Sequence, residues 1–218
     1  GERRLPGFLE ALLPSRRHPL VRDATRGFGL LHRLDVPSSG LVAAAKTYEA
    51  YYDMQLQLRA GRFQRDYVVL GHGWLPRARS LIDGRVHWVR EVSLPSIVSC
   101  RGKPSRTELV LTARGVHRGR ALGLADIRIA TGRRHQIRVH FAHIGHALAH
   151  DGRYAGKRTL AEDAVWCRRN FLHRYGLGFQ DAIGNSRSAT APLPSDLVAA
   201  LLRISPVGAA SARVMQHW

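Results

Sequence analysis

The chain has 218 residues, 44% of them hydrophobic, and a formal net charge of +18 at pH 7. This length suits one domain over residues 1–218, and no apolar run reaches the roughly 20 residues that span a bilayer, so a transmembrane helix is excluded. The positive charge points to a polyanionic partner, and nucleic acid explains it better than a membrane does.

Arginine carries almost all of this charge, because only three of the 34 basic residues are lysines. Its planar guanidinium forms bidentate bonds to phosphate and stacks on bases. A GC-rich genome would also raise the arginine share without any selection for binding. The two cysteines, Cys100 and Cys167, form no Cys-x-x-Cys pair. A disulfide framework is therefore not expected, and a reducing intracellular compartment is the default.

The N-terminal part of the chain predicts short elements. An apolar patch at residues 8–13 predicts a helix that Pro14 ends, and a basic polar loop is expected over residues 15–26. The apolar run at residues 41–45 predicts a short buried strand. Thr47 is a good N-cap for a helix that extends through Ala60, because its hydroxyl can accept a bond from a free N–H.

The rest of the chain mixes strands and helices. Strands are predicted at residues 64–70 and 122–129, with hairpins between them over residues 80–114. Apolar residues at helical spacing predict a helix from residue 134 to Gly145, and Ser195 or Asp196 can cap another one that runs to residue 202. Because these elements do not alternate strictly, the pattern favours an α+β fold over a doubly wound sheet.

A carboxylate at a bend is the first candidate site. Asp35 lies between the cationic pair His32-Arg33 and the turn residues 37–40, which are Pro-Ser-Ser-Gly. Proline fixes φ, serine bonds its own backbone and glycine permits positive φ, so a bend is expected here. Such a bend can hold a carboxylate rigidly with one side open to a substrate. An isolated motif of this kind more often has an aspartate that only caps a turn.

The second dense motif covers residues 131–146 and follows the strand at 122–129. A strand, a Thr-Gly turn and a basic helix start form a natural place for an anion, because free N–H groups and the helix dipole point there. The histidines between His135 and His150 do not present three ligands on one helix face, and no Glu-x-x-His partner accompanies them. No metal site is therefore expected.

Together these segments resemble the RluA-type pseudouridine synthases in composition, order and spacing. The matching motifs are His32-Arg33-Leu34-Asp35 with Ser39-Gly40, Arg65-Asp66-Tyr67, and residues 132–140, with smaller matches at residues 102–107, 150–154 and 171–173. The resemblance extends from about residue 30 to residue 202. It implies a pseudouridine synthase fold, with a mixed, mostly antiparallel sheet and flanking helices.

The resemblance also implies catalytic roles. Asp35 matches the family's catalytic aspartate, Tyr67 the tyrosine that packs on the uracil, and Arg138 the arginine that pairs with the aspartate. The implied reaction breaks the N-glycosidic bond of uridine, turns the base and joins its C5 to the ribose C1′. It involves no net redox change, so no cofactor is expected. An ionised carboxylate can act as nucleophile or stabilise an oxocarbenium-like species, and both roles stay open.

Five residues are expected to contact RNA: His32, Arg33, Arg133, Arg134 and His135. Arg33 matches the family's arginine that fills the stack left by an extruded base, and such a residue offsets part of the free energy of flipping. Arg133 and Arg134 suit phosphate contacts.

The sequence departs from the family's pattern at several places. Ser38 stands where threonine is usual, Arg65 replaces a lysine, and Arg174 and Tyr175 follow His173 where a small residue is usual. The family usually carries strands ending in Asn-Lys-Pro-x-Gly ahead of the aspartate motif, and these strands are expected to be missing here. No S4-type RNA-binding domain is expected in the chain.

Two functions of different classes follow. The first is an RNA pseudouridine synthase that acts on ribosomal or transfer RNA, within a ribosomal particle or outside one, with no membrane partner. The second is a catalytically idle relative that serves as an RNA-binding structural component, for example of an organellar, mitochondrial ribosome. The intact Asp35, Tyr67 and Arg138 favour the first, and the missing strands and arginine content favour the second. A glycosidase is weakly supported, because neither motif contains a second acid. Outside an organelle, the cytoplasm is the expected location.

Overall fold

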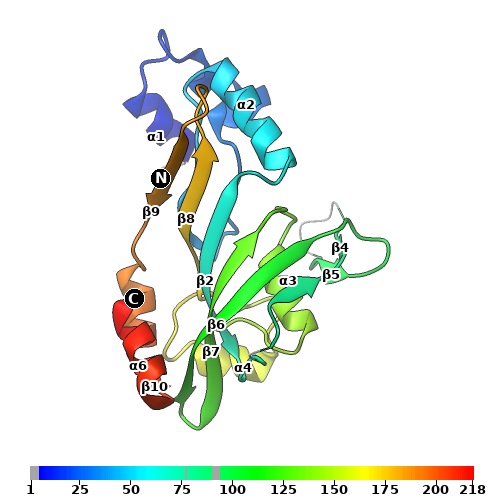
Figure 1. The fold of residues 1–218 in the computed structure, drawn as a ribbon, viewed down its shortest axis with the longest axis vertical. Helices are drawn as coiled ribbons and strands as arrows, with labels where there is room; N and C mark the ends of the chain where they lie inside the picture. The colour runs from blue at the N-terminus through cyan, green and yellow to red at the C-terminus, as the bar shows by residue number, and fades with distance from the viewer. Residues whose placement is uncertain (1–4, 77, 90–93) are drawn as a thin grey trace.

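Figure 1 shows a computed structural model, which describes residues 5–76, 78–89 and 94–218. Its strands are β1 (Ser39–Gly40), β2 (Gln64–His72), β3 (Leu81–Asp83), β4 (Val86–His87), β5 (Ile97–Val98), β6 (Arg106–His117), β7 (Arg120–Ile129), β8 (Leu172–Gln180), β9 (Ser186–Thr190) and β10 (Ser205–Pro206). The central sheet has the order β1-β8-β2-β7-β6-β10, with β3 beside β6 and β9 beside β8, while β4 and β5 form a separate pair. Only the β1–β8 pairing is parallel among these strand pairs. The expected mixed, mostly antiparallel sheet is confirmed.

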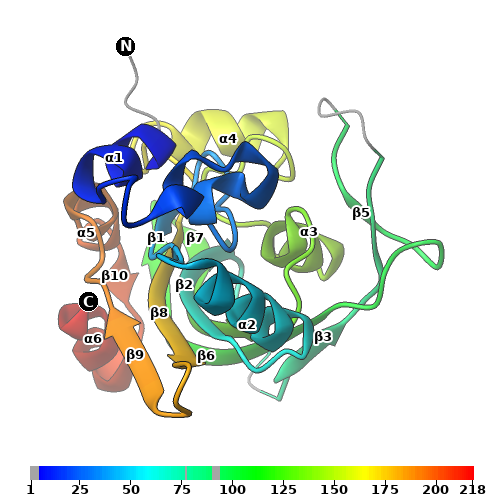
Figure 2. The same ribbon diagram turned by 90° about the horizontal axis from the view of Figure 1, so that it is seen from above.

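The helices are α1 (Leu5–Leu12), α2 (Tyr48–Arg59), α3 (Gln136–His143), α4 (Lys157–Asp163), α5 (Ser195–Leu201) and α6 (Gly208–His217), with 3-10 helices η1 (Pro19–Arg22) and η2 (Ala24–Gly29). Seen from above, α3 and α4 lie on one side of the sheet, and α5 and α6 lie beside β9 and β10 (Figure 2). Within the described ranges, no helix is long and apolar enough to cross a membrane.

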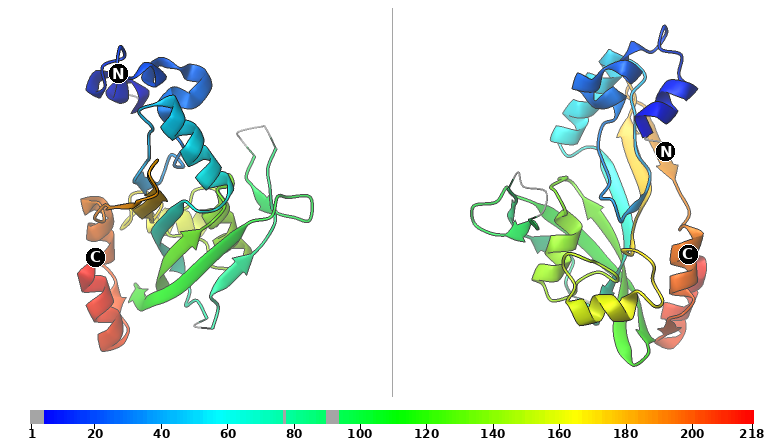
Figure 3. Two further views of the ribbon diagram at one scale, coloured as in Figure 1. Left: turned by 45° about the horizontal axis from the view of Figure 1, so that its top comes forward. Right: turned by 180° about the vertical axis from the view of Figure 1, so that it is seen from behind.

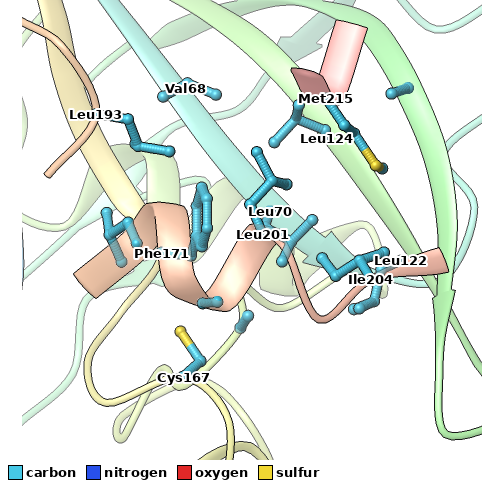
Figure 4. Packing of buried hydrophobic residues seen from close by; sticks show 14 of the residues in the cluster. Val68, Leu70, Leu122, Leu124, Cys167, Phe171, Leu193, Leu201, Ile204 and Met215 are labelled. Carbon is cyan, nitrogen blue, oxygen red and sulfur yellow. The ribbon is translucent and has the colours of Figure 1, made fainter. Parts of the chain in front are cut away.

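Strand β2 separates two hydrophobic clusters, because successive side chains of a strand point to opposite faces. Val68 and Leu70 belong to a cluster that includes residues of α5 and α6, part of which Figure 4 shows. Tyr67 and Val69 belong to the other cluster, which includes Phe141 of α3. The alternation therefore places Tyr67 on the α3 side of the sheet, where the candidate site lies.

Helix α2 forms as predicted. The Thr47 side chain accepts a hydrogen bond from the Ala50 N–H, and Gly61 follows the helix with a φ of +69°. The apolar side of the helix packs on a third cluster that contains Phe63, just before β2, and Leu177 of β8. Figure 3 shows α2, in cyan, in the upper part of the molecule. This packing fixes the end of α2 that contributes to the wall of the site.

Two of the predicted N-terminal segments are wrong. Residues 15–26 are not a polar loop, because η1 and the first half of η2 lie there. Leu20 and Val21 are buried, and Leu20 belongs to the third cluster. Residues 41–45 do not form a strand. The chain pairs with β8 just before this run, at residues 39–40, which form β1. Within residues 41–45, Ala44 makes an isolated β-bridge to Leu30.

Three smaller expectations also change. Within the hairpins predicted over residues 80–114, the β-rich piece that starts at residue 86 is limited to β4 in the described part, and residues 90–93 lie outside the described residues. Helix α5 begins after Pro194 without a side-chain cap, so neither Ser195 nor Asp196 is the N-cap. Helix α3 begins at Gln136, two residues later than predicted, because His135 adopts a left-handed conformation with a φ of +56°.

Gly40 is required where the loop at residues 31–41, which carries Asp35 and is called the aspartate loop below, meets β8. Its φ is +120°, and a Cβ built on it would overlap the backbone of Arg174. Overpacking costs about 1–3 kcal/mol and a strained φ a similar amount, so Gly40→Ala is expected to lower the free energy of unfolding by about 2–6 kcal/mol. Urea denaturation measures this loss. Gly184 has a φ of +84° with open space around it, so Gly184→Ala is the control for φ strain alone. Equal losses in both variants would disprove the role of close approach.

Candidate active site

A cavity of about 850 Å³ lies on the α3 side of the sheet. Its walls come from the loop at residues 31–38, the end of α2, strands β2 and β8, the segment at residues 129–138, and Trp88 beside β4. Seven of the described lining residues are arginines, and Asp35 is the one acid among them. The cavity therefore offers a strongly positive environment with one carboxylate in it.

Asp35 lies at the predicted bend, where the Ser38 N–H donates to the Asp35 carbonyl at 2.9 Å. Its Oδ2 accepts a hydrogen bond from Nη1 of Arg138 at 3.3 Å, and its Oδ1 lies 3.9 Å from Nε2 of His135. The side chain is 18% exposed. The carboxylate is thus held on one side by Arg138 of α3 and by His135, which directly precedes this helix. It remains accessible from the cavity.

Arg138 has a second carboxylate partner that sequence reasoning did not assign. Its Nε and Nη2 donate to the two oxygens of Asp151 at 2.8 and 2.7 Å, and Asp151 is fully buried. Burial opposes the charge on Arg138, but the bonds and charge of Asp151 together with Asp35 outweigh it and raise the pKa of Arg138. The backbone N–H groups of Arg153 and Tyr154 also donate to Asp151. The available sequence signal was the minor match at residues 150–154.

His135 links this group to a second wall of the cavity. Its Nδ1 lies 3.0 Å from the hydroxyl of Tyr154, and that hydroxyl accepts the Ser96 N–H at 2.9 Å. The Arg138 guanidinium lies over the Tyr154 ring, 5.2 Å from its centroid. Burial lowers the pKa of His135, although the charge of Asp35 acts in the opposite direction. His135 therefore stands beside the carboxylate predominantly as a neutral imidazole at pH 7.

Tyr67 is buried on β2, with only 4% of its surface exposed, and lines the cavity. Its hydroxyl accepts hydrogen bonds from Nε of Arg174 at 2.8 Å and from Nη2 of the same residue. Arg174 also approaches His32, whose Nδ1 lies 2.7 Å from the guanidinium. Sequence analysis noted Arg174 only as a departure from the family's pattern, so its contact with Tyr67 was missed.

The three remaining candidate RNA contacts differ in exposure. Arg33 is exposed at the cavity mouth. Arg133 is partly buried and donates to the Pro104 carbonyl at 3.4 Å. Arg134 donates to backbone carbonyls of Val89 and Leu94, at 3.2 and 3.3 Å, so it braces the segment that carries β4 and β5. The structure thus brings Asp35, Arg138, Tyr67 and all five candidate contacts to one cavity.

The inward position of His32 has a pH-dependent consequence. Burial, followed by the charges of Arg174 and Arg65, lowers the pKa of His32 to about 3. An unfolded histidine titrates near pH 6.5, so between about pH 6.5 and pH 3 the unfolded state binds more protons than the folded state. The contribution of His32 to the free energy of unfolding is therefore fully present above this pH window and is lost as the pH falls through it. Between pH 7 and pH 5 the expected loss from His32 is about 2 kcal/mol.

Urea unfolding at pH 7, 6 and 5 measures this loss. His32→Gln should flatten the pH dependence by about 2 kcal/mol over that range. His143→Gln, at an exposed position on α3, should leave it close to that of the unaltered protein. An unchanged slope in the His32 variant would contradict the assignment.

The sheet and the cavity together indicate a class of protein. An arginine-lined cavity with a single carboxylate fits a protein that binds a phosphate-rich polymer and presents a carboxylate to one of its units. The chain belongs to the RNA pseudouridylate synthase family, because the family model matches residues 15–143, more than half of the chain. The curated relatives described next place it in the RluA type within this family. The resemblance inferred from the motifs is confirmed.

Curated relatives agree with this assignment. Ribosomal large subunit pseudouridine synthase C of Yersinia pestis is 33% identical over 189 residues, which are 84% of this chain and 58% of that protein. Ribosomal large subunit pseudouridine synthase D of Nitrosomonas europaea is 34% identical over 182 residues, which are 81% of this chain and 51% of that protein. The chain therefore spans about half the length of the curated relatives it matches.

Solved structures share the fold. The human protein RNA Pseudouridylate Synthase Domain Containing 1 superposes with a TM-score of 0.70 at 21% identity, covering 87% of this chain and 80% of that one. Human RNA Pseudouridylate Synthase Domain Containing 4 gives a TM-score of 0.64 at 17% identity, covering 80% and 74%. The expected pseudouridine synthase fold is confirmed.

Proposed function

We propose that this chain is an RNA pseudouridine synthase that isomerises specific uridines of ribosomal RNA. The observation that carries the proposal is the position of Asp35, held by Arg138 in an arginine-lined cavity that also contains Tyr67. Membership of the family supports the reaction. The names of the relatives, which refer to the large ribosomal subunit, support the substrate.

Asp35 is the residue that acts on the sugar. The glycosidic bond of uridine breaks with positive charge developing at C1′, and a carboxylate can stabilise that charge or bond to the carbon. Arg138 keeps the carboxylate oriented, since Asp151 fixes its guanidinium from the opposite side. After the base has turned, C5 bonds to C1′ and loses its proton, so the reaction is an isomerisation without net redox change.

Tyr67 and the basic residues hold the RNA. The Tyr67 ring can pack on the detached uracil, and its hydroxyl can assist transfer of the C5 proton. A stacked base has to be flipped out to reach this cavity, at a cost of a few kcal/mol. Arg33, exposed at the mouth, fills the vacated place in the stack. Arg133, Arg134, His32 and His135 contact or shape the path of the phosphates around the flipped nucleotide.

The substrate and the setting follow from the relatives. Ribosomal RNA is favoured over transfer RNA, because the curated relatives named above are synthases of the large ribosomal subunit. Those relatives are bacterial and lend no support to the mitochondrial location considered from the sequence.

The test is pseudouridine formation in RNA that carries no modifications. The purified chain is incubated with transcripts of large-subunit, small-subunit and transfer RNA from the host, and pseudouridines are labelled chemically and located as reverse-transcription stops. New stops at one or a few uridines of large-subunit RNA are expected. Stops confined to transfer RNA would overturn the proposed substrate. Tight binding without any stop would instead identify a structural RNA binder with a synthase fold.

A further inference from the structure

Arg174 joins the two sides of the cavity that the proposed reaction uses. It lies on β8, between Tyr67 on the neighbouring strand β2 and the loop that carries Asp35. Its side chain is 4% exposed. A long cationic side chain is seldom buried to this degree without several partners, so its contacts show what it holds in place.

On one side Arg174 binds Tyr67 by two kinds of contact. Nε and Nη2 both donate to the Tyr67 hydroxyl oxygen, and the guanidinium carbon lies 4.9 Å from the centroid of the ring. A phenol oxygen has two acceptor positions and one hydrogen. Because both acceptor positions face Arg174, the hydroxyl hydrogen has to point away from the guanidinium, and the ring is held in one orientation.

On the other side Arg174 binds the loop at residues 31–41. Nη1 donates to the Leu41 carbonyl at 3.1 Å and lies 2.7 Å from Nδ1 of His32. His32 and Leu41 bracket the bend that presents Asp35. The backbone continues this attachment, since the Leu41 N–H donates to the Arg174 carbonyl at 3.1 Å. One guanidinium therefore contacts both ends of the aspartate loop and the tyrosine.

We propose that Arg174 is a positioning residue, which sets the Tyr67 ring and hydroxyl at a constant place relative to Asp35. This inference rests on the proposed function. Arg174 does not touch the reacting atoms and acts through the two residues that do. Lysine would not replace it, because a single ammonium cannot reach the Tyr67 hydroxyl and both loop acceptors with the fixed geometry of a guanidinium fork.

The test measures pseudouridine formation by Arg174→Ala and Arg174→Lys. Small misplacements of a catalytic group lower rates up to about 100-fold. Both variants should therefore lose about 10- to 100-fold in the single-turnover rate constant, while the protein concentration that gives half-maximal rate changes less than about threefold. Added guanidinium ion should restore part of the rate in the alanine variant, because it can occupy the vacated space between its partners.

Arg169→Ala is the matched control. Arg169 lies three residues before β8 and makes a two-point ion pair with Asp196, at 2.6 and 3.1 Å, away from the residues that line the cavity. The Arg169→Ala change also removes a guanidinium with several hydrogen bonds next to β8, and it should leave the rate constant within twofold of that of the unaltered chain. Arg174 variants that keep the full rate constant, or that lose activity only through weaker RNA binding, would overturn the proposal.

Hydrogen exchange separates this proposal from the proposed function. Amides of residues 31–41 should exchange faster in both Arg174 variants than in the unaltered protein and in Arg169→Ala. If the unaltered chain forms no pseudouridine in any RNA, the proposed function fails, and exchange alone then decides whether Arg174 holds the loop. Unchanged exchange in residues 31–41 would overturn the positioning role in that case also.

Discussion

Asp35→Asn is expected to reduce the rate constant of pseudouridine formation by at least about 10³-fold, as is usual when the group that reacts with the substrate is removed. Asparagine has nearly the same shape but no negative charge, so it can neither bond to C1′ nor stabilise charge there. Arg138 retains its two-point contact with Asp151 in this variant, and the fold should persist. Single-turnover assays on the RNA identified by mapping measure the loss.

The control for Asp35→Asn is Asp181→Asn. Asp181 lies between β8 and β9, where its carboxylate bonds Arg187 and neighbouring backbone N–H groups. It is not among the residues that line the cavity, so this variant should keep its activity. An Asp35→Asn protein that retains more than a tenth of the activity would contradict the assignment of Asp35 as the residue that acts on the sugar.

Asp151→Asn is expected to lower both the stability and the activity of the chain. Removal of one partner from a buried ion pair costs about 3–5 kcal/mol, because the other charge is left without compensation. The loss here should lie near 3 kcal/mol, since Asp35 still lies 3.3 Å from the Arg138 guanidinium. The released guanidinium should turn toward Asp35, and the rate of pseudouridine formation should fall at least about tenfold. Urea unfolding and single-turnover assays provide the two measurements.

A double variant separates stability from catalysis. Apolar replacement of both members of a buried ion pair is often close to neutral for stability. Arg138→Met combined with Asp151→Leu should therefore unfold at nearly the urea concentration of the unaltered protein, yet remain inactive because nothing orients Asp35. If the double variant were active, the ion pair would serve only the fold.

Arg65 is a further buried cation in the wall of the cavity. It is 5% exposed, and burial lowers its pKa. No hydrogen-bond partner is present for the Nε of Arg65 among the described residues. Its Nη2 donates to the Ala130 carbonyl, but none of the described residues forms an ion pair with it, so an anionic RNA segment in the cavity would stabilise its charge. We therefore expect RNA to raise the thermal stability of the chain as well as to be bound by it.

Several features were predictable from the sequence because local patterns determine them. The α2 helix begins directly after its N-cap, Thr47, and ends before Gly61, since capping and positive φ are properties of single residues. The alternation in β2 and the helical spacing in α3 follow from the periods of the two structures. The motifs around Asp35, Tyr67 and Arg138 were sufficient to indicate the family, and the structure places these three side chains in one cavity.

Contacts between distant segments could not be predicted in the same way. Leu20 looked like part of a basic loop, because the cluster that buries it includes residues far along the chain, such as Phe63 and Leu177. The strand beside the aspartate was predicted at residues 41–45, but its position depends on where Gly40 can approach β8.

The sequence by itself determined the fold class, the family and the residues to examine, since propensities, periods and motif spacing are written along the chain. The tertiary structure alone decided what holds those residues in place. Asp35 and Arg138 are 103 positions apart, and Tyr67 and Arg174 are 107 apart. No local pattern encodes such pairs, because the register of β2 and β8 and the placement of α3 on the sheet bring them together. Those same long-range contacts select Asp151 and Arg174 as the partners of the candidate catalytic residues.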